Sequence, residues 1–272
     1  MSENELIKMT KEPNTRESMR SQFRLLGIQE GMTVIVHSSL KSLGWVSGGA
    51  VAVVQALMDA VGEMGTIVMP TQSADNSDPS DWENPPVPES WWKLIRETWP
   101  AYDPQYTPTR GMGQIVEVFR TFPGVKRSKH PALSFAAWGK EADAILSDQT
   151  LEEAFGHGSP LEKIYERNGY VLLIGVTHDS NTSLHLAEHF IPGREKDKKG
   201  AAVLINGERQ WVTYEETRYD SDPFEELGSQ FEKENPISTG FVGNAFCRLM
   251  EQRLIVDYAK DWLIQHVNEI KS

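Results

Sequence analysis

Apolar residues along the chain recur in short β-branched runs that alternate with longer amphipathic segments. Thr33–Val36, Thr66–Met69 and Tyr170–Ile174 have the length and composition of buried strands. Ala50–Val61 presents a broad apolar face and ends before Gly62, a pattern typical of a helix with a glycine stop. Because strands separated by helices favour parallel pairing, the pattern predicts an α/β fold built on a mostly parallel sheet.

Other segments extend this prediction. Further helices are expected at Ser90–Thr98, Gln114–Phe119, Pro160–Asn168, Phe224–Glu234, Gly243–Gln252 and Val256–Glu269, and a further strand at Ser134–Trp138. Val203–Tyr214 predicts a hairpin around Asn206-Gly207, a pair suited to a type I′ turn. We therefore expect a three-layer α/β sandwich: a mostly parallel central sheet between helices, with the hairpin as an antiparallel addition.

One long segment departs from this alternation. Thr71–Pro108 is rich in Pro, Asp and Trp, and Ser90–Thr98 is its only convincing helix. An irregular stretch of this size within a compact domain is more often a functional rim than filler. We expect one domain over residues 1–272, with this rim at about 71–108.

The charge balance limits the partners of the chain. It holds 39 acidic and 27 basic residues, a formal net charge of −12. Long-range repulsion opposes binding to nucleic acid or to an anionic membrane surface, whereas a cationic small molecule is permitted. Improved solubility is the simpler explanation of the same charge, and charge alone does not decide between the two.

Compartment signals favour the cytoplasm. Apolar runs stay well short of the ~20 residues that a membrane span needs. The first twenty residues are charged and lack the apolar core of a secretory signal. Cys247 is the single cysteine, so no internal disulfide is possible, which suits a reducing compartment.

The most promising chemistry follows the strand Tyr170–Ile174. A helix is expected to begin near Asn181 or Thr182, which places His185 in its first turn, at the carboxyl end of a strand where α/β sheets bind ligands. Glu188, three residues on, shares a helix face with His185. A carboxylate there holds the tautomer of the imidazole while the other ring nitrogen acts as a general base. The alternative is a surface helix that happens to carry both residues.

The same helix admits a second interpretation. His185-Leu-Ala-Glu-His189 matches H-x-x-E-H, in which two histidines bind zinc and the glutamate activates water. Such a site needs a third protein ligand, and no downstream carboxylate is singled out by the sequence. A zinc-dependent hydrolase therefore remains an alternative at this point.

Four segments, taken together and in order, resemble the aminoglycoside 3-N-acetyltransferase family. They are Val36–Gly49, Thr107–Gly113, Val125–Pro131 leading into Ser134–Gly139, and Leu172–Glu188. The resemblance covers the chain from about Ser21 to the last helix. The Arg/Gln-x-x-Gly-x-Gly/Ala motif of the commoner acetyltransferase superfamily is absent, as this resemblance requires.

The resemblance implies that acetyl-CoA is the co-substrate and assigns a binding region to it. The loop His37–Gly49 lies between a strand and a helix, so its backbone N–H groups are suited to cradle an anion at the helix N-terminus. The expected CoA-binding residues are His37, Ser38, Ser39, Lys41 and Ser42 from this loop, and Thr109, Gly111, Met112, Arg127 and Ser128 from the two following segments.

The resemblance also implies a catalytic and an acceptor side. His185 matches the catalytic histidine of the family and Glu188 the acidic residue of the same motif, whereas His189 has no counterpart, so no metal is expected. On the acceptor side, Glu216 matches an acidic position that faces the aminoglycoside, and His157 lies in a loop that borders the active site. Asp75 belongs to a candidate anionic lip with Asp78, Asp81 and Glu83. For each of these carboxylates, solvated surface charge is the simpler explanation.

The resulting expectation is an acetyl-CoA-dependent N-acetyltransferase that modifies the 3-amino group of an aminoglycoside, an activity that gives antibiotic resistance. Acetylation of a different amine, a zinc-dependent hydrolase and an inactive CoA-binding protein are the alternatives. The expected partners are CoA and a cationic amine, without nucleic acid or membrane, and the expected state is a monomer or homodimer.

Overall fold

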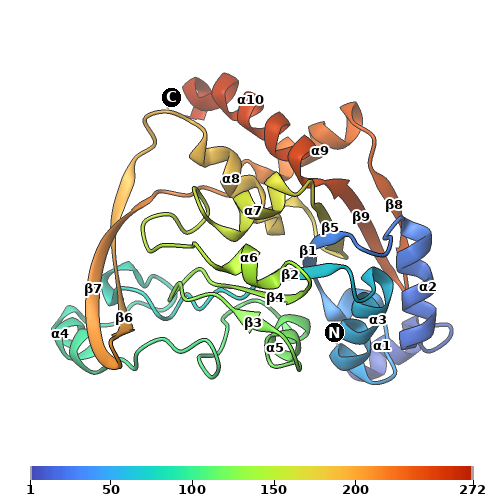
Figure 1. Cartoon of the computed structure of the whole chain (residues 1–272), viewed down its shortest axis with the longest axis horizontal. Helices are drawn as coiled ribbons and strands as arrows, with labels where there is room; N and C mark the ends of the chain where they lie inside the picture. The colour runs from blue at the N-terminus through green and yellow to red at the C-terminus, as the bar shows by residue number, and fades with distance from the viewer. Residues whose placement is uncertain (1, 271–272) are drawn as a thin grey trace.

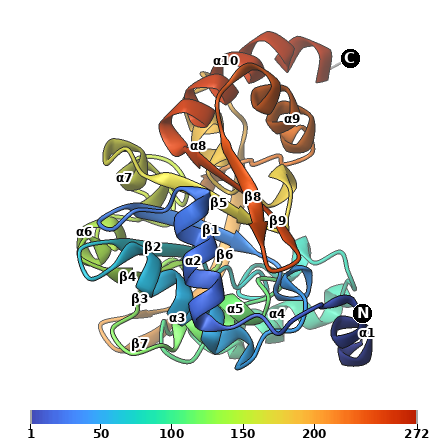
Figure 2. The same cartoon turned by 90° about the vertical axis from the view of Figure 1, so that its right-hand side faces the viewer.

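A seven-stranded sheet forms the centre of the molecule. The computed structural model describes residues 2–270, and its sheet has the strand order β3-β4-β2-β1-β5-β9-β8 (Figures 1 and 2). The strands are β1 Thr33–Ser38, β2 Thr66–Pro70, β3 Lys126–Arg127, β4 Phe135–Gly139, β5 Tyr170–Ile174, β8 Ser238–Val242 and β9 Ala245–Glu251. The three strands predicted from β-branched runs, β1, β2 and β5, are the adjacent central ones.

Parallel pairing is confined to these central strands. β1 pairs in parallel with β2 on one side and with β5 on the other. The outer strands β4, β3, β9 and β8 all join in antiparallel fashion. The α/β class and the central parallel pairing are confirmed, and the flanking strands make the complete sheet mixed.

Helices cover both faces of the sheet. They are α1 Glu3–Met9, α2 Arg16–Leu26, α3 Gly49–Val61, α4 Glu89–Thr98, α5 Gln114–Arg120, α6 Ala142–Leu146, α7 Pro160–Glu166, α8 Leu184–His189, α9 Phe224–Glu234 and α10 Gln252–Ile270, with 3-10 turns η1 Leu40–Leu43, η2 Pro79–Asp81 and η3 His178–Ser180. None of the helices within residues 2–270 combines the length and apolarity that a membrane crossing requires.

The alternation of side chains in β1 divides the core into two layers. Val34 and Val36 pack with α2, α3 and α5 on one face, whereas Ile35 packs with the cluster of α6 to α10 on the other. All three side chains are at most 1% exposed. A strand buried on both faces has no polar alternation, which is why its sequence is a continuous apolar run.

The helix predicted at Gly243–Gln252 is wrong, because this segment is mostly strand β9. Ala245, Cys247 and Leu249 are buried while Phe246 between them is 38% exposed, a period of two that belongs to a strand. Gly243 has φ 54° and turns the chain from β8 into β9. The Gly243-Asn244 pair is itself a hairpin signal, and the apolar content of the segment concealed it.

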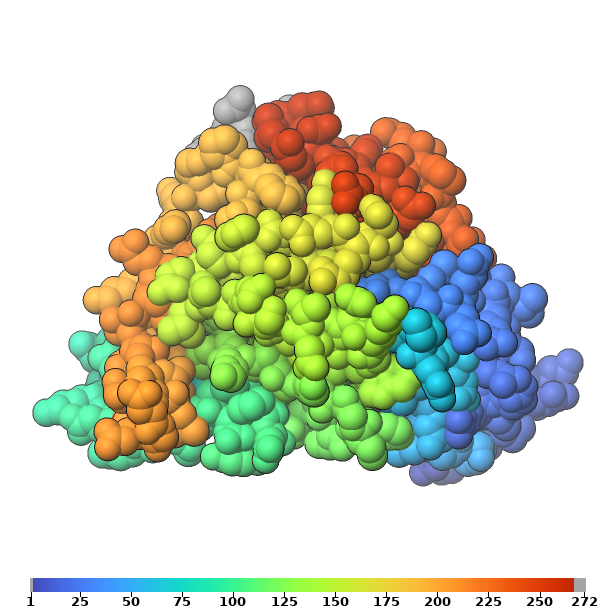
Figure 3. All heavy atoms as spheres, viewed as in Figure 1, coloured from blue at the N-terminus to red at the C-terminus, as the bar shows by residue number. Residues whose placement is uncertain are grey.

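The predicted hairpin is present and longer than expected. β6 Lys196–Ile205 and β7 Glu208–Thr217 pair over their whole length, and Asn206 and Gly207 both have positive φ, as a type I′ turn requires. The hairpin lies beside α4 at one edge of the molecule (Figures 1 and 3). Arg209 donates to the carbonyl oxygens of Trp99 and Arg96, which ties the hairpin to the 71–108 segment.

Candidate active site

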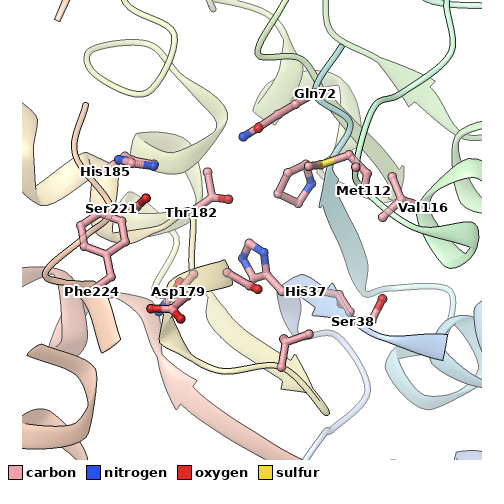
Figure 4. Close-up of a pocket in the computed structure, with 16 residues that line it drawn as sticks. His37, Ser38, Gln72, Met112, Val116, Asp179, Thr182, His185, Ser221 and Phe224 are labelled. Atoms are coloured by element: carbon pink, nitrogen blue, oxygen red, sulfur yellow. The ribbon is translucent and has the colours of Figure 1, made fainter. Parts of the chain in front are cut away.

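A cavity of about 330 Å³ opens at the carboxyl ends of the three parallel strands. β1 contributes His37 and Ser38, the segment after β2 contributes Gln72, and α8 contributes His185. Figure 4 shows the side chains of His37, Gln72 and His185 around the same space. The cavity thus occupies the edge of the sheet at which α/β folds bind ligands.

Aromatic rings hold His185 in one orientation. Its imidazole stacks on Phe155, with centroids 5.0 Å apart and planes 5° from parallel. Tyr219 and Phe224 pack against it with centroids at 5.2 and 4.8 Å. The side chain is only 15% exposed. Because three rings limit its rotation, His185 presents a fixed edge to the cavity.

Glu188 fixes the tautomer of that imidazole. Nδ1 of His185 lies 2.6 Å from Oε2 of Glu188, whose side chain is 1% exposed. The second carboxylate oxygen accepts hydrogen bonds from the backbone N–H of Asp220, at 2.9 Å, and from the Arg194 guanidinium. A carboxylate accepts hydrogen bonds, so in the neutral imidazole the proton lies on Nδ1 and Nε2 has a free lone pair. This arrangement suits His185 to act as a general base.

His37 is a second imidazole at the cavity. It follows Val36 in β1 and therefore points to the face of the sheet that carries α8. Burial lowers the pKa of His37 to about 3, and the neighbouring His178 and His185 add to this effect. Its Nε2 atom makes no hydrogen bond to any residue that the structure describes. His37 is thus neutral at physiological pH and has a polar atom left for a ligand.

The buried neutral state of His37 has a consequence for acid stability. Between pH 6.5 and about 3, His37 binds a proton in the unfolded chain but not in the folded chain. The free energy of unfolding therefore decreases as the pH falls through this range. We expect wild type to lose about 2 kcal/mol more unfolding free energy between pH 7 and pH 5 than a His37→Asn variant. Urea unfolding of both proteins at the two pH values measures the difference. An equal loss of unfolding free energy in wild type and His37→Asn would contradict the prediction.

The expected CoA-binding residues divide into two groups. His37, Ser38, Gly111 and Met112 line the cavity. The others lie outside its lining: Ser42 donates to the carbonyl oxygen of Ser39 at 2.7 Å, the Thr109 hydroxyl donates to Glu117 at 2.5 Å, and Lys41 is exposed on η1.

Arg127 and Ser128 belong to a buried network beneath the rim. Arg127 donates to the carbonyl oxygens of Thr71, at 2.6 Å, and Thr107, at 2.5 Å. Ser128 donates to Oε1 of Gln149 at 2.6 Å. The Arg127 contacts connect both ends of the rim to the sheet. Neither Arg127 nor Ser128 lines the cavity.

On the expected acceptor side, Glu216 and Asp75 have different surroundings. Glu216 is 4% exposed and lines a separate depression of about 290 Å³ beside Tyr219. Asp75 forms an ion pair with Arg110 at 2.7 Å. Two further carboxylates of the lip are paired as well, Asp78 with Arg96 and Asp81 with Lys199.

His157 lies apart from both hollows. Its side chain is 84% exposed, and Nδ1 lies 3.1 Å from Glu162. It lines neither the 330 Å³ cavity nor the depression at Glu216.

Several residues of the site were missed by sequence reasoning. They come from segments distant from His185 in the sequence: Gln72 follows β2, and Phe155 lies before α7. Tyr219 and Ser221 lie between β7 and α9, and Phe224 is the first residue of α9. Asp179 and Thr182 also line the cavity and stand in the segment that carried the prediction. Their position between a strand and the His185 helix was the available signal.

The helix of His185 begins later than expected. α8 starts at Leu184, because Asn181 forms a local turn in which its Oδ1 accepts from the backbone N–H of Ser183. His185 still lies in the first helical turn, as predicted.

The two histidines of the H-x-x-E-H pattern have separate partners. His189 Nδ1 lies 3.2 Å from Glu153, whereas His185 is paired with Glu188. Throughout residues 2–270, no group of three or more His, Cys, Asp or Glu side chains is arranged to hold a metal ion. A zinc site needs at least three protein ligands around one ion, so the lack of such a group among these residues disfavours the zinc interpretation.

Comparison with known proteins gives consistent matches. The family model described as aminoglycoside 3-N-acetyltransferase matches residues 35–264. The chain is 51% identical over 262 residues to the SPbeta prophage-derived aminoglycoside N(3')-acetyltransferase-like protein YokD of Bacillus subtilis, with 96% of each chain covered. The crystal structure of YokD superposes with a TM-score of 0.96, at 50% identity, over 98% of this chain and 99% of that one.

Some of the similar structures contain ligands. AAC-IIIb, in a binary complex with CoASH, has a TM-score of 0.84 at 29% identity, with 94% of this chain and 98% of that one covered. AAC-VIa bound to sisomicin has a TM-score of 0.85 at 30% identity, with 94% and 99% covered.

Proposed function

The chain belongs to the aminoglycoside 3-N-acetyltransferase family, and we propose that it transfers the acetyl group of acetyl-CoA to an amino group of an aminoglycoside. The observation that carries the proposal is the buried pair of His185 and Glu188 at the wall of the cavity, with Nε2 of the imidazole free. Acyl transfer to an amine needs such a base, because the ammonium form has no lone pair with which to attack.

In the proposed reaction, Nε2 of His185 takes a proton from the acceptor ammonium. The amine nitrogen then forms a bond to the thioester carbonyl carbon, and the carbonyl oxygen becomes an oxyanion. Collapse of this intermediate breaks the carbon–sulfur bond, and the second proton lost by the nitrogen reaches the thiolate or solvent. The ionised Glu188 stabilises the imidazolium while it exists, since the two groups are 2.6 Å apart.

For the donor side, we propose that the cavity end at His37, Ser38, Gly111 and Met112 receives the thioester arm of acetyl-CoA. The first turn of α3 has no side-chain cap at Gly48, so its N–H groups are suited to a phosphate. The other expected CoA-binding residues remain predictions: Ser39, Lys41, Ser42, Thr109, Arg127 and Ser128. The CoASH complex of the similar AAC-IIIb supports CoA as the co-substrate.

For the acceptor side, we propose the depression lined by Glu216. Tyr219 lines this depression and also packs against the ring of His185, so a bound amine there is one aromatic ring away from the base. The sisomicin complex of the similar AAC-VIa supports an aminoglycoside as the acceptor. Asp75 in the irregular rim and His157 in its loop remain predicted neighbours of the acceptor.

The proposal predicts amine-dependent thiol release. Purified protein mixed with acetyl-CoA is expected to release free CoA thiol when sisomicin, gentamicin or a simple diamine is added, and to release little without an amine. A thiol-reactive dye follows the reaction continuously. Release that is independent of every amine would indicate a thioester hydrolase, and no release with any amine would overturn the proposed function.

A further inference from the structure

The acceptor depression is lined by charges from both strands of the hairpin. In β6, Asp197 and Lys199 stand opposite Glu216 and Tyr214 of β7, respectively, and all four side chains line the depression. Asp81 of the rim and Arg218, which follows β7, complete the charged lining. Figure 3 shows the hairpin beside the rim at this edge of the molecule.

Most of these charges neutralise one another. Lys199 Nζ lies 3.3 Å from Asp81 and 3.7 Å from Asp197. Arg218 lies 2.6 Å from Asp197, and its hydrogen bond holds the pKa of that carboxyl below its usual range. Lys199 and Arg218 are therefore already paired with the carboxylates of Asp81 and Asp197. Ammonium groups of a substrate would otherwise bind to these carboxylates.

Glu216 is the exception in this lining. It is 4% exposed, and its Oε1 atom makes no hydrogen bond among the residues described. The nearest basic group is His130 Nε2, at 3.6 Å. Nδ1 of His130 accepts from the backbone N–H of Leu133, which leaves Nε2 as the donor of this ring, and Nε2 lies 3.3 Å from the carbonyl oxygen of Leu151. A buried carboxylate oxygen without a partner is suited to an ammonium ligand.

We infer that Lys199 and Arg218 are internal counterions that weaken the binding of polycationic acceptors relative to amines that present one ammonium group to Glu216, besides the amine that reacts. The inference rests on the proposed function and narrows its substrate class. A polycationic aminoglycoside must place further ammonium groups close to Lys199 and Arg218, or displace them from Asp81 and Asp197. Like charges a few ångströms apart at a protein surface lower affinity by about tenfold per pair.

The matched pair Lys199→Met and Lys198→Met tests this inference. Both variants remove one positive charge from β6, but Lys198 is exposed and does not line the depression. The probes are gentamicin, a polycation, and 1,3-diaminocyclohexane, a compact diamine. Binding of each probe to the CoA complex is measured by titration calorimetry, and kcat/KM by thiol release. Thermal unfolding confirms folding, and Lys199→Gln replaces Lys199→Met if the latter unfolds.

Lys199→Met is expected to increase the affinity and kcat/KM for gentamicin about tenfold and to leave the diamine within about twofold. Lys198→Met is expected to change both probes by about twofold or less. Equal responses of the two variants, or wild-type protein that binds neither probe, would overturn the inference. If wild-type protein releases thiol but Lys199→Met changes the affinities for gentamicin and the diamine alike, the inference is refuted and the proposed function stands. If Lys199→Met strengthens the binding of gentamicin alone but no protein releases thiol, the proposed function is refuted.

Discussion

Replacing His185 with alanine is expected to lower kcat/KM for acetyl transfer by about 10²- to 10⁴-fold, the usual contribution of a positioned general base. The reason is the free Nε2 atom, which the Glu188 contact at Nδ1 and the stacking of Phe155 hold toward the cavity. The loss should be smaller at high pH, where more of the acceptor amine is already unprotonated. Steady-state thiol release over a range of pH values measures both effects.

His189→Ala is the matched control for this prediction. His189 lies on the same helix and also pairs with a carboxylate, Glu153, but it does not line the cavity. We expect this variant to keep activity within a fewfold of wild type, and CoA to raise the melting temperature of both variants as it does that of wild type. Equal losses in the two variants would favour the zinc interpretation, and full activity in His185→Ala would remove His185 from the proposed mechanism.

Replacing Glu188 with glutamine is expected to impair both activity and stability. The neutral amide no longer requires the proton of His185 to lie on Nδ1, and an amide N–H donated to Nδ1 would place the proton on Nε2 instead. That tautomer cannot accept a proton from the substrate, so kcat should fall about 10²-fold. The variant also leaves the partly buried Arg194 without its counterion, at a cost of about 2–3 kcal/mol.

Urea unfolding and thiol release on the same preparation measure the two effects of Glu188→Gln. Glu153→Gln is the control, since it removes the carboxylate partner of His189 rather than that of His185. We expect Glu153→Gln to stay within about 1 kcal/mol of wild type, because this ion pair is partly exposed. Wild-type kcat in Glu188→Gln would show that the pair with His185 has no part in catalysis.

The central sheet was predictable because its strands are buried on both faces. Continuous apolar runs such as Tyr170–Ile174 leave little alternative to a buried strand. The flanking strand β9 was mistaken for a helix because Phe246 is apolar yet exposed, so the apolar residues of the segment do not show its period of two. The short strand Lys126–Arg127 gives no periodic signal at all.

The candidate site was predictable where one continuous segment carries it. His185 and Glu188 are three residues apart on one helix, so their contact follows from helical geometry alone. The aromatic rings around His185 come from Phe155, Tyr219 and Phe224, and only tertiary packing brings these positions together. The internal pairing of the lip carboxylates depends in the same way on contacts across the rim and the hairpin, such as Asp81 with Lys199.

Mass spectrometry of the acceptor after reaction distinguishes acetyl transfer to the amine from hydrolysis of the thioester. Wild-type protein, acetyl-CoA and an amine are incubated, and acetylated amine is counted against free CoA thiol. We expect one acetyl group on the amine for each thiol released, and we expect both products to decrease together in His185→Ala. Release of thiol together with acetate and an unmodified amine would contradict the proposed function, because the chain would then transfer the acetyl group to water.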